Sequence, residues 1–463
     1  MLFNSYEFIF LFLPISFFVY FLLNKQGHFN YSKLFLVFAS LFFYSWWNVI
    51  YLPLILISMV FNFSIGNVFT NNKIKNRSKK IVLGLGILGN LSLLGYFKYS
   101  DFFIENYNLI SGSDVNLLHL ALPLAISFFT FQQISYLVDS FKGFTSEYKI
   151  IDYMVFVTFF PQLIAGPIVH HKEMMPQFKD DENKKINYDN ISKGLFIFSL
   201  GLFKKVAIAD SFASYATNGF DVVEKLSFID AWITSLSYTF QLYYDFSGYT
   251  DMAIGLALLF NIKLPLNFNS PYKALNIQDF WRRWHMTLSR FLRDYIYIPL
   301  GGNKVGEFRI YANLLITFIL AGIWHGAGWT FILWGLLHAL AIITYRVWTK
   351  FGVKLNIVLA WFITFNFVNI TWIFFRAKDF DSAIKVLKGL VDIRTLNIGE
   401  ILQHKYIIFG LFIILLVSVF AKNSIEYLRD FKTDFKTLLF ASILFSISVI
   451  CLTRVSEFLY FNF

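Results

Sequence analysis

Long apolar stretches recur along the whole of this 463-residue sequence, and they limit its fold more than any other feature. A helix needs about 20 mostly apolar residues to cross a bilayer. Hydrophobic residues make up 57% of the chain and charged residues only 15%, whereas a soluble domain carries about a quarter of charged residues. These features predict an all-α polytopic membrane protein that forms a single transmembrane domain over residues 1–463.

About twelve of the apolar stretches are long enough to be transmembrane helices. The predicted spans are Tyr6–Leu23, Leu34–Tyr51, Leu54–Phe69, Ile81–Phe97, Leu120–Phe141, Ile191–Ala209, Trp232–Phe246, Ile310–Trp329, Phe331–Val347, Ile357–Phe375, Ile407–Phe420 and Leu438–Leu452. Pro and Gly interrupt Tyr153–Ile168 and Met252–Leu266, which predicts re-entrant or half-depth segments. The first stretch has no basic region or small-residue cleavage site before it, so we expect it to be retained as a span.

The distribution of charge predicts a topology. The loop 73–80 contains five basic residues and no acid, and such loops face the cytoplasm. One span later, the segment 101–114 contains three acids and no basic residue, as expected outside. Counting onward places 267–309 in the cytoplasm and both termini outside. The net charge of +11 is then a property of cytoplasmic loops, and no nucleic-acid partner is expected.

The densest polar cluster lies in Asn276–Tyr295, which predicts one interfacial helix. Asn276 is placed to cap this helix and Asp279 lies in its first turn. Apolar residues recur at helical spacing on one face, and four arginines and His285 gather on another. These arginines are Arg282, Arg283, Arg290 and Arg293. Four arginines exclude a lipid-facing span, so the helix is expected at the cytoplasmic interface.

Two interpretations of these arginines remain open. They anchor the helix at the membrane surface while their charged ends reach water. Alternatively, their guanidinium groups hold the phosphates of an anionic acyl donor such as coenzyme A, because guanidinium binds phosphate through two parallel hydrogen bonds. In that case His285 orients the donor or relays a proton.

The second polar segment is Asn313–His338, where His325 lies inside a predicted span among Gly322, Gly326 and Gly328. An ionisable side chain at membrane depth is costly and is a functional candidate for that reason. His325 is therefore either a general base or nucleophile, or a structural histidine where small residues let helices pack. His338 has an ordinary span context and is expected to be structural.

The remaining polar residues favour structural roles. Asp245 and Asp251 flank a turn predicted at Ser247–Gly248 and need cationic partners. Candidates for that pairing are Lys204, Lys205 or an arginine of the interfacial helix. No metal site is expected: Cys451 is the only cysteine, and the adjacent His170 and His171 point in different directions on any regular element.

Six segments in order resemble the membrane-bound O-acyltransferase (MBOAT) family, and within it the alginate and peptidoglycan O-acetyltransferase branch. They are MLFNSYEFIFLFLPI, LPLAISFFTFQQISYLVD, FFPQLIAGPIVHHKEMMPQF, YYDFSGYTDMAIGLALLFNI, NFNSPYKALNIQDFWRRWHMTLSRFLRDYIYIPLGGNK and AGIWHGAGWTFILWGLLH. The resemblance implies tilted helices around a central tunnel. It also implies a catalytic histidine in the WHG motif, here His325, and a second in the WRRWH motif, here His285.

The resemblance further implies the reaction and its partners. A member of this branch in the bacterial cytoplasmic membrane takes acetyl groups from acetyl-CoA, a donor substrate rather than a resident cofactor. It passes them to an extracytoplasmic SGNH-type transferase, which esterifies a polysaccharide, with peptidoglycan as the first expectation. Open alternatives are acetylation of alginate or another exopolysaccharide, D-alanyl transfer to teichoic acid, a transporter of lipid-linked sugars with His325 as proton relay, and a scaffold.

Overall fold

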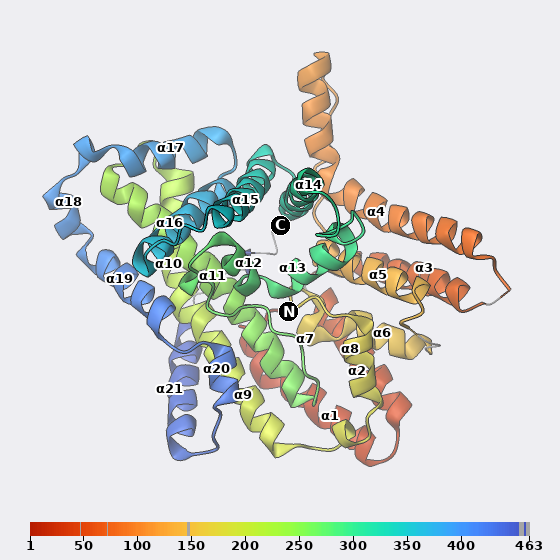
Figure 1. Cartoon of the computed structure of the whole chain (residues 1–463). Coiled ribbons are helices and arrows are strands. Elements are labelled where there is room, and N and C mark those ends of the chain that lie inside the picture. The colour runs from red at the N-terminus through yellow and green to blue at the C-terminus, as the bar shows by residue number, and fades with distance from the viewer. Residues whose placement is uncertain (47, 72, 146–148, 453–457, 460–463) are drawn as a thin grey trace. The chain divides into compact units, whose positions relative to one another are not determined.

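The computed structural model describes residues 1–46, 48–71, 73–145, 149–452 and 458–459, and every regular element in these residues is a helix. The all-α class is therefore confirmed (Figure 1). The chain divides into two compact units. Unit 1 contains Met1–Leu202, Tyr249–Pro265 and Phe431–Phe463, and unit 2 contains Phe203–Gly248 and Leu266–Asp430. The single domain over 1–463 stays a prediction.

Helices are labelled α, and short 3₁₀ or π-helical segments η. Unit 1 contains η1 (Phe8–Phe12), α1 (Leu13–Lys25), α2 (Phe29–Ser45), η2 (Val49–Tyr51), α3 (Leu52–Thr70), α4 (Asn76–Ser111), α5 (Ile126–Phe141), α6 (Ile150–Thr158), α7 (Phe160–Leu163), α8 (His171–Lys179), η3 (Glu182–Lys184), α9 (Tyr188–Phe203, except its last residue) and α21 (Phe435–Cys451). Helix α11 (Phe228–Leu259) begins in unit 2 and ends in unit 1. Unit 2 also contains η4 (Lys204–Ala209), α10 (Asp210–Thr217), η5 (Asn218–Val222), η6 (Pro271–Lys273), α12 (Ile277–Arg283), α13 (Met286–Leu292), η7 (Arg293–Tyr297), α14 (Glu307–His325), α15 (Trp329–Trp348), η8 (Thr349–Phe351), α16 (Ile357–Arg376), α17 (Phe380–Val391), η9 (Ile393–Thr395), α18 (Ile398–Gln403), α19 (Lys405–Phe420) and α20 (Ser424–Arg429).

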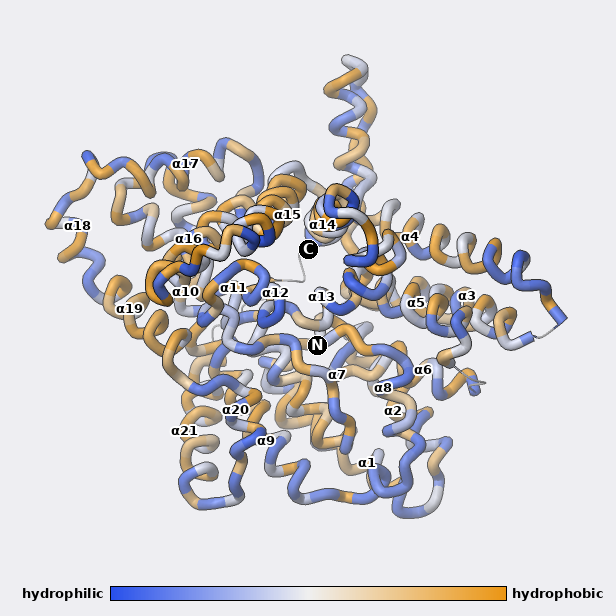
Figure 2. Tube along the Cα trace, viewed as in Figure 1, coloured by the Kyte–Doolittle hydropathy of each residue, from blue (hydrophilic) through white to orange (hydrophobic). Residues whose placement is uncertain are grey.

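Within the described residues, six helical segments are long and apolar enough to cross a membrane. They are Phe8–Lys25, Val49–Thr70, Asn76–Ser111, Glu307–His325, Trp329–Phe351 and Ile357–Arg376. Two shorter apolar helices are α19 and α21, and Figure 2 shows hydrophobic residues along both. The predicted multi-pass architecture is supported, while the count of twelve spans stays a prediction. Trp47 of the predicted span Leu34–Tyr51 lies outside the described residues.

The structure corrects one region of the predicted span pattern. Trp232–Phe246 and Met252–Leu266 were expected as two segments separated by a turn at Ser247–Gly248, but α11 continues through that point. The glycine of the second segment, Gly255, serves helix packing rather than a break. A Cβ on Gly255 would lie 2.6 Å from the carbonyl oxygen of Gly194, so only residues without a side chain let α9 and α11 approach this closely.

The broken segment predicted at Tyr153–Ile168 is confirmed. Helix α6 ends at Thr158 and α7 covers only Phe160–Leu163. Pro161 lies in the first turn of α7, the position where proline costs no hydrogen bond. At the break, the backbone N–H of Phe160 donates to the hydroxyl of Ser40 over 3.1 Å. A side chain thus satisfies one of the polar groups that the break leaves without a helical partner.

Candidate active site

His325 is the last residue of α14, and its side chain is enclosed by aromatic rings. The residue is 2% exposed. Its imidazole contacts the rings of Trp324, Trp334 and Phe375, with centroid separations of 4.9, 5.1 and 4.9 Å. The predicted span ran on to Trp329, but the helix ends at His325 and α15 begins at Trp329. His325 therefore lies at the tip of the hairpin formed by α14 and α15.

The glycines near His325 let these two helices approach each other. A Cβ on Gly322 would lie 2.3 Å from the carbonyl oxygen of Phe331, and one on Gly335 would lie 2.3 Å from that of Phe318. A Cβ on Gly326 would lie 2.1 Å from the Phe331 ring. Close helix packing accounts for these glycines, and it fixes the position of the histidine at the end of α14.

The prediction of a single interfacial helix over Asn276–Tyr295 was wrong, because the helix is broken at His285. Asn276 caps α12 as predicted, because its side chain accepts from the backbone N–H of Asp279 over 2.8 Å. Helix α12 ends at Arg283, α13 begins at Met286, and His285 has a left-handed backbone with a φ of 43°. Non-glycine residues seldom adopt this conformation, and they often do so at functional sites.

A preceding chain segment holds the break open. The N–H of Asn269 donates to the carbonyl of Arg283, and the N–H of Met286 donates to the carbonyl of Asn267, both over 2.9 Å. These backbone bonds replace the helical bonds that the break removes. The partners lie outside the segment itself, so its helical periodicity gave no sign of them.

Asn267 also fixes the protonation of His285. Its side-chain oxygen accepts from the N–H and the hydroxyl of Thr287, at 3.2 and 3.0 Å, and it lies 3.1 Å from His285 Nδ1. An amide oxygen only accepts, so Nδ1 carries the proton and Nε2 of the neutral ring keeps a lone pair. His285 lies outside the candidate spans, and burial lowers its pKa to about 3. The ring is therefore neutral at pH 7.

His338 was predicted to be structural on sequence grounds, but it belongs to the same aromatic environment. It is fully buried on α15, and its Nδ1 accepts from the indole N–H of Trp281 on α12 over 3.2 Å. Its ring lies 4.7 Å from that of Trp334, which also contacts His325. His285 in turn lies 6.3 Å from Trp324, the neighbour of His325. We call this connected set the histidine–tryptophan cluster, made of Trp281, His285, Trp324, His325, Trp334 and His338.

The four arginines differ in their surroundings. Arg283 Nε lies 2.9 Å from both carboxylate oxygens of Asp279, four residues earlier. Arg293 Nε donates to the neighbouring Asp294 over 2.7 Å. Arg282 is exposed and forms no ion pair within the described part of the chain, and Arg290 is half-buried. Because the helix is broken between them, they no longer share one helical face as predicted.

The pairing predicted for Asp245 is confirmed. Lys205 Nζ lies 2.6 Å from Asp245 and 2.8 Å from Asp210, and all three side chains are buried. Lys204 Nζ donates to the hydroxyl of Ser424 over 2.8 Å. The pairing of Asp251, which is also buried, stays a prediction.

Among the described residues, no group of three or more His, Cys, Asp or Glu side chains could hold a metal ion. His170 and His171 face different neighbours. His170 Nδ1 lies 3.5 Å from Asp139, while the ring of His171 packs 4.8 Å from that of Phe156.

Comparison with known proteins identifies the class of this chain. The profile of MBOAT, the membrane-bound O-acyltransferase family, matches residues 8–377. The chain belongs to the membrane-bound O-acyltransferase family, as its six sequence segments predicted.

Its relatives are acyltransferases by name. The chain is 50% identical to the peptidoglycan O-acetyltransferase of Helicobacter pylori, across 100% of this chain and 98% of that protein. It is 40% identical to the probable alginate O-acetylase AlgI of Pseudomonas aeruginosa, across 87% of this chain and 77% of that protein. A teichoic acid D-alanyltransferase of Bacillus subtilis is 29% identical across 56% of this chain and 69% of that protein. These matches confirm the predicted class of enzyme, an O-acyltransferase.

Proposed function

We propose that this protein takes acetyl groups from cytoplasmic acetyl-CoA and passes them across the bacterial cytoplasmic membrane for O-acetylation of peptidoglycan. The observation that carries the proposal is the buried His325, enclosed by three aromatic rings at the end of a candidate span in a member of an acyltransferase family. The choice of peptidoglycan is supported by the relative that is 50% identical over the whole chain.

In the proposed reaction, the acceptor oxygen attacks the thioester carbonyl of the donor. The new C–O bond forms as the C–S bond breaks, and coenzyme A leaves as the thiol after taking up the proton. In this direct route His325 is the base that removes the acceptor's proton. In the alternative route a ring nitrogen of His325 attacks the thioester carbonyl, a C–N bond forms as the C–S bond breaks, and coenzyme A leaves as the thiol with the proton of the imidazole. The acceptor oxygen then attacks the acetyl-imidazole, the C–O bond forms as the C–N bond breaks, and the acceptor's proton returns to the imidazole. The aromatic rings around it exclude water, which protects the thioester from hydrolysis.

His285 is proposed as the second catalytic group. Its neutral ring, with the proton held on Nδ1 by Asn267, presents Nε2 as a hydrogen-bond acceptor that can orient the donor. Arg282, Arg283, Arg290 and Arg293 are proposed to bind the donor's phosphates. The surroundings of Arg282 favour it over Arg283 and Arg293, whose guanidinium groups already contact acids.

A separate extracytoplasmic SGNH-type transferase is proposed to receive the acetyl group and esterify the polysaccharide. The 463 residues contain no block resembling the Gly-Asp-Ser-Leu nucleophile motif of such transferases, which supports a division of labour. Co-purification from membranes, with the tagged chain as bait, tests this partnership. The expected result is an SGNH-type protein retained in stoichiometric amount, and its absence from a complex that still acetylates the polysaccharide contradicts the proposal.

The function is tested with His325→Ala, which we expect to reduce ester-linked acetate on peptidoglycan to background. Each ~1.36 kcal/mol added to the activation free energy slows a reaction tenfold. Loss of an essential base or nucleophile adds far more than that to the activation free energy. The measurement is acetate released by mild alkali from purified peptidoglycan, normalised to the amount of protein in the membrane. His28→Ala, at an exposed histidine, is the matched control and should behave as wild type.

Three outcomes distinguish the alternatives. Normal peptidoglycan acetate in well-expressed His325→Ala cells removes this histidine from the mechanism. Acetate on alginate or another exopolysaccharide, or D-alanine on teichoic acid, in place of peptidoglycan acetate reassigns the acceptor while keeping the family. A purified protein that moves unmodified lipid-linked sugar and consumes no acetyl-CoA contradicts acyl transfer altogether.

The proposed direction of transfer depends on topology. Single cysteines in 73–80 and in 101–114, in a Cys451→Ser background, are probed with an impermeant thiol reagent on intact cells. We expect labelling of the second loop only, because the first is rich in basic residues. Labelling of the first loop alone inverts the topology and places Arg282 on the wrong side for a cytoplasmic donor.

A further inference from the structure

A groove of about 720 Å³ lies within unit 1, between α9 and α21. Helix α9 contributes residues from Ser192 to Ser199, and α21 contributes residues as far as Phe445. The ring of Phe196 contacts those of Phe431 and Phe440, at 5.5 and 6.2 Å, and so links the two sides. This volume lies in the range of roughly 300–1,000 Å³ that is usual for ligand sites.

The groove is apolar along most of its length. Its walls include Leu195, Phe198, Leu438 and Phe445, and the neighbouring outer face of α21 exposes large apolar side chains. From Asp434 to Phe445 the groove extends about 16 Å along α21 at 1.5 Å per residue. One leaflet of the hydrocarbon core is about 15 Å thick. The groove therefore matches the depth of one leaflet.

The apolar walls of the groove suit lipid acyl chains. In a bilayer such chains fill apolar grooves, because an unfilled void loses dispersion contacts.

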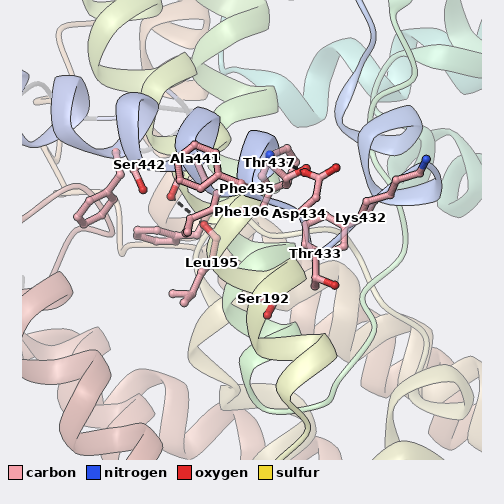
Figure 3. Close-up of a pocket in the computed structure, with 15 residues that line it drawn as sticks. Ser192, Leu195, Phe196, Lys432, Thr433, Asp434, Phe435, Thr437, Ala441 and Ser442 are labelled. Atoms are coloured by element: carbon pink, nitrogen blue, oxygen red, sulfur yellow. Dashed lines mark hydrogen bonds between the residues drawn. The ribbon is translucent and has the colours of Figure 1, made fainter.

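One end of the groove is polar and carries opposite charges. Figure 3 shows Lys432, Thr433 and Asp434 at this end and Ser442 at the other. Asp434 caps α21, where its Oδ1 accepts from the N–H of Thr437 over 2.8 Å. Lys432 is exposed and forms no ion pair with any described residue. The polar end thus lies where an apolar helix begins, with one cation and one carboxylate two residues apart.

We propose that this groove binds one phosphatidylethanolamine molecule of the bilayer. The acyl chains lie against Phe196, Phe198 and Leu438, the phosphate contacts Lys432, and the primary ammonium contacts the carboxylate of Asp434. A zwitterionic headgroup complements this pair of charges, whereas a glycerol headgroup offers the carboxylate no cation. The groove and the histidine–tryptophan cluster share no residue, so the proposal stands independently of acyl transfer.

The position of the lipid is tested by native mass spectrometry of the full, delipidated chain with added phosphatidylethanolamine. Wild type should retain one molecule. Ser442→Trp places a large ring in the groove and should weaken retention by about tenfold or more. Ile443→Trp, at the adjacent exposed position outside the groove, is the matched control and should retain the lipid as wild type does. Equal retention by the two variants overturns the assignment of the site.

The headgroup is tested with two charge variants and a second lipid. Lys432→Ala should weaken binding about fivefold, because its charge is exposed, while Lys436→Ala, at a basic residue that does not line the groove, should not. Asp434→Asn keeps a good helix cap but removes the negative charge, so it should abolish the preference for phosphatidylethanolamine over phosphatidylglycerol. Unchanged preference in Asp434→Asn, equal binding of both lipids by wild type, or a copurifying peptide helix in the groove overturns the proposal.

Discussion

Unit 2 buries polar side chains in two regions that differ in how the burial is compensated. In the first, which we call the ionic cluster, Lys205 lies between Asp210 and Asp245 at 2.8 and 2.6 Å. In the second, the histidine–tryptophan cluster, the imidazole of His325 packs against three aromatic rings, with centroid separations of 4.9 to 5.1 Å. The first region balances charge with charge, and the second packs imidazoles among aromatic rings.

This difference separates a structural role from a chemical one. A buried lysine between two carboxylates is held in its charged form, because losing that charge leaves the acids uncompensated. A neutral imidazole has one nitrogen that donates and one that accepts, which lets it bind or transfer a proton during a reaction. We therefore expect changes in the ionic cluster to affect the amount of folded protein, and changes in the histidine–tryptophan cluster to affect turnover.

The largest effect on stability is expected for Lys205→Met. It leaves Asp210 and Asp245 buried without their cation, and breaking a buried ion pair costs about 3–5 kcal/mol. The measurement is the yield and thermal unfolding of the purified protein. Adding Asp210→Asn and Asp245→Asn should restore much of the loss, because no uncompensated charge then remains. Wild-type stability of the single variant shows that the ionic cluster is dispensable.

A smaller effect is expected at His338, which joins α15 to α12. His338→Leu removes the acceptor for the indole N–H of Trp281, and a buried donor without a partner costs about 1–3 kcal/mol. His338→Asn keeps an acceptor near the position of Nδ1 and should recover most of this loss.

If His338 positions Trp334 against His325, turnover should follow the same order, with His338→Leu slower than His338→Asn. The measurement is kcat for acetyl transfer in both variants, corrected for the folded fraction. Equal kcat in wild type and His338→Leu leaves His338 as a packing residue only.

Much of the fold could be predicted from the sequence, because the signal is local. Apolar stretches of span length are visible in any window of about 20 residues, and helices α14, α15 and α16 lie within a few residues of their predicted starts. The errors occur where distant residues decide local structure. Gly255 packs against Gly194 inside a helix, and bonds from Asn267 and Asn269 hold open the break at His285.

The candidate site was predictable in part for the same reason. His325 is an ionisable residue in an apolar segment with a family motif, so the sequence indicates it directly. His338 ends the same family-like segment but lies outside its WHG motif, and its partner Trp281 lies 57 residues away in the chain. Trp334 and His338 are four residues apart, and side chains at this spacing meet on one face of a helix. This spacing could have indicated their contact from the sequence.

The smallest effect is expected for variants of the arginines. Comparing Arg282 with Arg293 distinguishes donor binding from membrane anchoring. Arg282 is exposed and has no acidic partner among the described residues, whereas Arg293 contacts Asp294. Removing an exposed charge costs about 1 kcal/mol at most, or roughly fivefold in affinity. Arg282→Gln should therefore raise the KM for acetyl-CoA about fivefold, while Arg293→Gln should change it little. The measurement is donor KM in purified, folded protein. If both variants keep the wild-type KM and accumulate to lower levels in the membrane, these arginines are anchors, and the donor's phosphates are bound elsewhere.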